Sequence, residues 1–93
     1  MDYSVIMQML EDNTLTIDNL AYIIARTGGV TKHDVQESVR EAMTYVRNSC
    51  TKFETAKTAQ DLRNRAEYIS MRAEQLEKLE KIKYALEWAI LPD

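Results

Sequence analysis

The stretch from Thr31 to Phe53, TKHDVQESVREAMTYVRNSCTKF, carries the pattern that decides the fold. Apolar and small residues recur along it with steps of 4, 3, 4, 3 and 4 residues. This spacing is typical of a helix that packs lengthwise against another helix at a shallow angle. The positions of this seam are Val35, Val39, Ala42, Val46, Ser49 and Phe53, with Met43 and Cys50 beside them.

The residues just before this stretch predict where its helix begins. Thr31 is suited to the N-cap, and Asp34 stands three residues later, at the reciprocal position of a capping box. The pair Gly28-Gly29 ends the preceding helix, because glycine accepts the left-handed conformation of a C-terminal cap. We therefore expect a helix from residue 32 onward, separated by a tight turn from a helix at residues 17–26.

Two short helices are predicted before this turn. The helix at residues 17–26 has Thr16 as its N-cap and Asp18 in its first turn, where the helix dipole favours an anion. A shorter helix at residues 3–11 has one apolar side and ends in the polar run from Glu11 to Thr14.

A fourth helix is predicted from Thr58, its N-cap, to about Ile90. Its first half repeats the 4, 3, 4, 3 spacing, and no Gly or Pro separates Phe53 from Thr58, so one helix over residues 32–90 is the competing arrangement. We favour an all-α domain over residues 1–93, with two short helices in residues 1–31 packed on a long antiparallel helical hairpin in residues 32–93. The apolar positions with this spacing in the first half of the fourth helix are Leu62, Ala66, Ile69, Ala73 and Leu76.

Composition bounds the class of protein. The chain has 93 residues, of which 45% are hydrophobic and 29% charged, with two Gly and one Pro. This balance excludes a disordered tail and a turn-rich all-β domain. No apolar run approaches the roughly 20 residues of a membrane span, so no membrane partner is expected. A single cysteine, Cys50, favours a reducing, cytoplasmic compartment over a disulfide framework.

The end of the fourth helix is apolar on nearly all sides, which indicates that it is covered by more than one neighbour. Ile82, Leu86 and Ile90 form one stripe, which we assign to the core of the monomer. A second stripe is expected to face a partner, and we predict a homodimer with a further protein partner. The candidate interface residues are Tyr84, Trp88 and Leu91, together with Tyr22 from the apolar run at residues 20–25.

Basic residues gather in residues 47–72, where six Lys and Arg outnumber Glu54, Asp61 and Glu67. We expect this region to be the far tip of the hairpin, either solvated or in contact with an acidic protein or phosphates. The basic tip candidates are Arg47, Lys52, Lys57, Arg63, Arg65 and Arg72.

Chemistry-bearing motifs are missing from the sequence. His33 and Cys50 are 17 residues apart on one predicted helix, about 25 Å, too far to form a nucleophile–base pair. The Glu-x-x-His pairs of di-iron bundles are absent, and Gly28-Gly29 lacks the context of a phosphate-binding loop. We therefore predict no catalytic residue, no cofactor, no metal and no enzymatic activity.

The segment from Ile24 to Val35, IARTGGVTKHDV, resembles the helical opening of HU-type nucleoid proteins. The resemblance implies a helix–turn–helix connection, but the β-arm pattern through which those proteins bind DNA does not follow. The sequence thus predicts a non-enzymatic protein–protein interaction module of adaptor, inhibitor or chaperone type. The alternative is a nucleic-acid-associated regulator that uses the basic tip or the helix–turn–helix region at residues 17–47.

Overall fold

The computed structural model describes residues 1–49 and 58–91, and this part of the chain is helical, with no strand. The all-α class is confirmed, and the predicted starts of all four helices agree with the structure. The last helix ends two residues earlier than predicted. The helices are α1 (Tyr3–Glu11), α2 (Ile17–Arg26), α3 (Lys32–Ser49) and α4 (Ala59–Trp88). The predicted positions Cys50, Lys52, Phe53, Glu54 and Lys57 lie outside the described residues.

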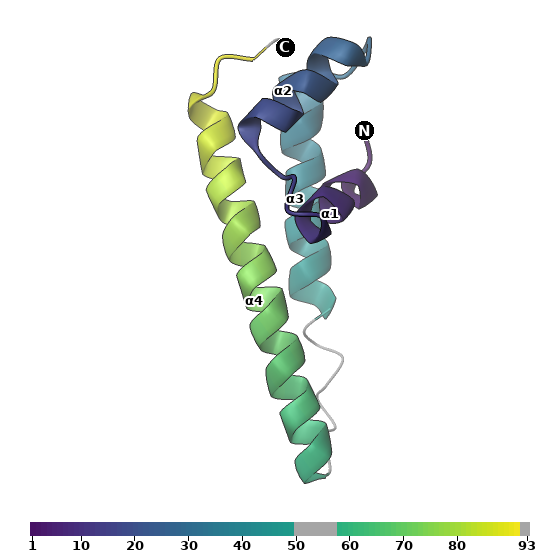
Figure 1. The fold of residues 1–93 in the computed structure, drawn as a ribbon, viewed down its shortest axis with the longest axis vertical. Coiled ribbons are helices and arrows are strands. Elements are labelled where there is room, and N and C mark those ends of the chain that lie inside the picture. Colours follow the sequence, from purple (N-terminus) through teal and green to yellow (C-terminus); the bar gives the residue numbers. More distant parts are fainter. Residues whose placement is uncertain (50–57, 92–93) are drawn as a thin grey trace.

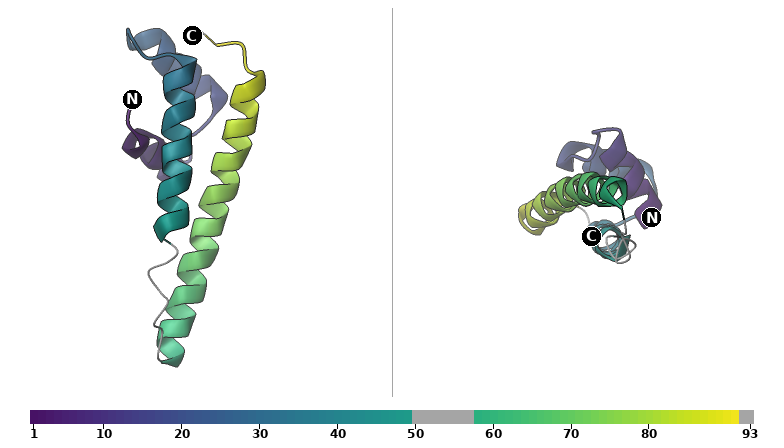
Figure 2. Two further views of the ribbon diagram at one scale, coloured as in Figure 1. Left: turned by 180° about the vertical axis from the view of Figure 1, so that it is seen from behind. Right: turned by 90° about the horizontal axis from the view of Figure 1, so that it is seen from below.

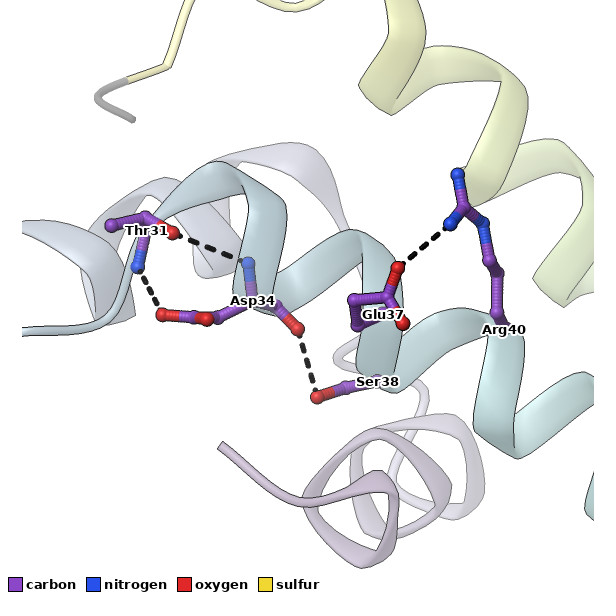
Figure 3. A network of polar contacts seen from close by, with 5 residues as sticks. All are labelled: Thr31, Asp34, Glu37, Ser38 and Arg40. Carbon is purple, nitrogen blue, oxygen red and sulfur yellow. Dashed lines mark hydrogen bonds and ion pairs between the residues drawn. The ribbon is translucent and has the colours of Figure 1, made fainter.

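Side-chain caps lie at the starts of the helices, and those of α2, α3 and α4 are the ones that the sequence predicts. The hydroxyl of Thr16 accepts from the Asn19 backbone N–H at the start of α2, and that of Thr58 accepts from the Asp61 N–H at the start of α4. At α3 the predicted capping box is complete. The Asp34 N–H donates to Thr31 Oγ1 at 3.2 Å, and the Thr31 N–H donates to Asp34 Oδ2 at 3.0 Å (Figure 3).

The glycine pair follows the end of α2, but the cap differs from the prediction, because Thr27 after the helix is extended, with φ −104° and ψ 100°, and the left-handed glycine lies in the turn beyond it. Gly29 has a φ of 93°, in the left-handed region that a residue with a side chain rarely adopts. The Val30 N–H donates to the Thr27 carbonyl across this turn, so the chain reverses before α3 begins.

Helices α3 and α4 lie side by side, and α1 and α2 both lie on one side of this pair (Figures 1 and 2). α1 packs mainly on α3, while α2 contacts α4. Lys32 Nζ, at the start of α3, donates to the Ala89 carbonyl, just past the end of α4, at 3.0 Å. The start of α3 therefore lies beside the end of α4.

The hydrophobic core lies where α1 and α2 meet this pair. Every seam position of α3 from Val35 to Ser49 is buried, as the spacing predicted. Ser38 is buried as well, and its hydroxyl donates to the carbonyls of Asp34 and Met1 (Figure 3 shows the first of these bonds). Besides the α3 residues, the core holds Ile6, Met7, Met9, Leu10, Leu20, Ile24, Leu79, Ile82 and Leu86.

The first half of α4 departs from the predicted packing. It extends past the end of α3, as Figure 1 shows. Leu62 is 55% exposed, Ala66 and Ala73 are exposed, and Ile69 is half-buried. The spacing predicts the stripe on this half of α4, but a stripe is buried only where another element packs against it.

The molecule is elongated because α4 is so much longer than the rest. Its radius of gyration is 15.4 Å and its extents are 50 × 20 × 17 Å, whereas a compact globule of this length would have a radius near 12 Å. Among the described helices, none combines the length and hydrophobicity that a bilayer crossing needs.

Candidate functional site

Two large aromatic side chains stand in solvent on the last two turns of α4. Tyr84 is 67% exposed and Trp88 is 76% exposed. They are four residues apart and therefore share one face of the helix. Leu79, Ile82 and Leu86 are buried on the face that packs against the rest of the molecule. The structure thus brings together two of the four residues that the sequence proposed as an interface.

Tyr84 borders a shallow groove of about 370 Å³ between α3 and α4. The lining of the groove contains charges of both signs beside apolar surface. No residue of α1 or α2 lines it, so this part of the α3–α4 pair is not covered by the two short helices. The lining residues are Met43, Arg47, Glu80, Lys83, Tyr84 and Glu87.

The residues after α4 lie on the opposite sides from those predicted. Ile90, assigned to the core, is 100% exposed, while Leu91, assigned to the interface, packs against the core. The reason is that the helix ends at Trp88, and Ala89 is extended, with φ −73° and ψ 138°. Successive side chains of an extended chain point to opposite sides, so the helical spacing no longer applies.

Tyr22 lies on α2 rather than on α4. It is 59% exposed, and the guanidinium of Arg26, one turn later, lies 5.0 Å from its ring centroid. Such a cation–π contact at an exposed site orders both side chains on the surface of α2. Tyr22 therefore forms a separate exposed aromatic position.

The basic tip candidates are distributed over different surroundings. Arg47 lines the groove together with Glu80 and Glu87. Arg72, in the middle of α4, contacts the rings of two tyrosines, one on α3 and one on α4. Arg63 and Arg65 lie on the first half of α4, while Lys52 and Lys57 are outside the described residues. The nucleic-acid alternative stays a prediction.

A tyrosine–arginine cluster was not foreseen from the sequence. The Tyr3 and Tyr45 rings lie 5.4 Å apart, and the Arg72 guanidinium lies 5.5 Å from the Tyr45 centroid and 5.1 Å from that of Tyr68. Arg72 also donates to the Tyr68 hydroxyl and to Gln75 Oε1. The cluster joins α1, α3 and α4. Only the four-residue spacing of Tyr68 and Arg72 gave a local signal for it.

Among the described residues, His33 and Asp34 are titratable groups in the first turn of α3. His33 is exposed in the first turn of α3. The pKa of Asp34 is lowered, chiefly by the hydrogen bond from the Thr31 backbone N–H, which is a structural role in the capping box. Within residues 1–49 and 58–91, no three or more His, Cys, Asp and Glu residues gather as a metal site would require.

Comparison of the chain with models of protein families, with curated proteins and with solved structures gave no match.

Proposed function

We propose that this protein is a non-enzymatic helical interaction module of adaptor, inhibitor or chaperone type, which self-associates through the outer face of α4. The observation that carries the proposal is the pair Tyr84 and Trp88, at 67% and 76% exposure on one face of a well-packed helix. Large aromatic side chains held in solvent on a rigid element mark protein–protein interfaces.

A second copy of the chain fits this surface because the neighbouring groove is electrically self-complementary. Arg47 and Lys83 are positive, whereas Glu80 and Glu87 are negative, and all four line the same groove. In a twofold symmetric contact the same patch meets itself, so each positive side chain can face a negative one. A patch of one sign would repel its copy.

The proposal includes the arrangement of residues 32–93 as an antiparallel helical hairpin that carries the two short helices on one side. The packing of α3 on α4 and the Lys32–Ala89 hydrogen bond support this arrangement. The placement of the protein in a reducing, cytoplasmic compartment rests only on the single cysteine of the sequence.

The substitution Trp88→Ala tests the proposal. An interface Trp commonly contributes at least about 2 kcal/mol, so the dimer dissociation constant should rise about thirtyfold or more. Sedimentation across a concentration series measures that constant for wild type and variant, and circular dichroism monitors helicity, which should not change because Trp88 is mostly exposed.

Leu62→Ala is the matched control, since Leu62 is also an exposed apolar residue of α4 but lies on its first half. It should leave the dissociation constant unchanged. A wild-type protein that stays monomeric, or an equal loss from Leu62→Ala and Trp88→Ala, would refute self-association through this face.

A further inference from the structure

A second groove lies on the other side of α4, between this helix and the turn that joins α1 to α2. Its volume is about 460 Å³, within the range of roughly 300–1,000 Å³ typical of small-molecule sites. The end of α1, the turn after it and α4 contribute residues to it. The lining residues are Leu10, Asn13, Leu15, Thr16, Lys78, Lys81, Ile82 and Ala85.

The lining combines an apolar floor with two cations at the rim. Leu10 and Ile82 belong to the buried core, and Leu15 and Ala85 are half-buried beside them. The two charged residues in the lining are both lysines, and no carboxylate lines the groove. This arrangement suits a ligand with an apolar body and an anionic end.

The wall formed by the turn is already shaped in the free protein. Asn13 adopts the left-handed conformation at φ 58°, which Asn tolerates better than most residues. The Thr14 N–H donates to the Met9 carbonyl at 2.8 Å, and Asn19 Nδ2 donates to the Thr14 carbonyl at 2.7 Å. A preformed wall lowers the entropic cost of binding.

Both lysines are available to an anion at small cost. Lys78 Nζ donates to Asn13 Oδ1 at 3.4 Å, which spans the groove from α4 to the turn. Lys81 Nζ pairs with Glu77 Oε1 at 3.3 Å, and both side chains are more than half exposed. Such exposed pairs contribute little, so a ligand carboxylate can compete for these ammonium groups.

We propose that the groove between α4 and the α1–α2 turn binds a medium-chain carboxylate, its alkyl chain on the apolar floor and its carboxylate beside Lys78 and Lys81. The inference is independent of the outer face of α4, because Tyr84 and Trp88 do not line this groove.

The probes are decanoate, decan-1-ol and decyltrimethylammonium, which share one alkyl chain and differ in the charge of the end group. Titration of the full chain, followed by amide chemical shifts, should give decanoate the tightest binding. The largest shifts should fall in residues 10–16 and 78–85. Decan-1-ol binding as tightly as decanoate, tighter binding of the cationic probe, no binding of decanoate, or shifts centred on Tyr84 and Trp88 would each overturn the assignment.

The double substitution Lys78→Gln with Lys81→Gln should weaken decanoate binding roughly five- to tenfold, as expected for two exposed charge pairs. Arg63→Gln with Arg65→Gln changes the net charge equally on the first half of α4, where neither residue lines this groove, and should leave the affinity unchanged. Equal losses from the two double variants would show only a general charge effect and would overturn the proposal. The Trp88→Ala variant should bind decanoate normally, which separates this test from that of self-association.

Discussion

At the scale of single residues, Leu86 and Ile90 show that the position where α4 ends decides which side chains are buried. They are four residues apart, yet Leu86 is fully buried and Ile90 fully exposed. Leu86→Ala should lower the free energy of unfolding by about 2–5 kcal/mol, because it removes buried methyl groups from the core. Ile90→Ala should change it by no more than about 0.5 kcal/mol. Urea unfolding of the two variants measures both values, and similar losses would contradict the early end of α4.

Asp34 predicts a specific dependence of stability on pH. Its pKa is lowered below 3.8, chiefly by the bond from the Thr31 backbone N–H, while partial desolvation opposes the shift. A lowered folded-state pKa means that the carboxylate stabilises the fold above the unfolded-state pKa. This contribution is lost as the pH falls through the lowered value.

The substitution Asp34→Asn isolates this contribution, because an amide does not titrate. The wild type should be the more stable protein near neutral pH, and its advantage over the variant should shrink as the pH falls below about 3.8. Urea unfolding at a series of pH values gives the difference, in which the titration of the other carboxylates cancels. A difference that stays constant with pH would show that the charge of Asp34 contributes nothing to the cap.

At the scale of the elements, Arg72 connects the middle of α4 to α3 through Tyr45. Arg72→Ala should lower the free energy of unfolding by about 1–2 kcal/mol, since two cation–π contacts of about 0.5–1 kcal/mol each are lost. In this variant, amide hydrogen exchange should become faster in the first half of α4, and the increase there should be larger than in α3. Arg63→Ala, on the exposed first half, is the control and should change stability by no more than about 0.5 kcal/mol.

A double-mutant cycle separates the contact from general effects of the substitution. Combined with Tyr45→Leu, Arg72→Ala should lose about 0.5–1 kcal/mol less than the sum of the single losses, because each single change already removes the shared contact. Strict additivity would mean that Arg72 does not act through Tyr45.

The elements that the sequence predicted well are those whose causes lie close together in the chain. The capping box joins Thr31 and Asp34, three residues apart, and the seam of α3 is buried over its described length. The first half of α4 has the same spacing as α3, but Leu62, Ala66 and Ala73 are exposed, because burial depends on which element packs against the stripe. No periodicity within α4 carries that information.

The candidate site shows the same division. The exposure of Tyr84 and Trp88 follows from the two stripes on α4, so the sequence indicated it. The tyrosine–arginine cluster joins Tyr3 to residues on α3 and α4, and the second groove joins the turn after α1 to α4. Both depend on how the two short helices pack on the α3–α4 pair, which spacing along the chain does not specify.

At the scale of the whole molecule, the two short helices cover one side of the α3–α4 pair near one end, and half of α4 projects from the other (Figure 1). Almost all the buried apolar residues therefore lie in one part of an elongated molecule. The projecting half is held by the Arg72 cluster rather than by core packing. This uneven distribution makes the dimensions of the monomer a test of the fold.

Small-angle scattering of the Trp88→Ala variant, under conditions where sedimentation shows a monomer, should give a radius of gyration close to 15.4 Å. A compact chain of 93 residues would give about 12 Å. The larger value is expected because the first half of α4 does not pack on the core, as the exposure of Leu62 and Ala66 shows. A monomer with the compact radius would mean that this half folds back on the core, and the projecting helix would then be wrong.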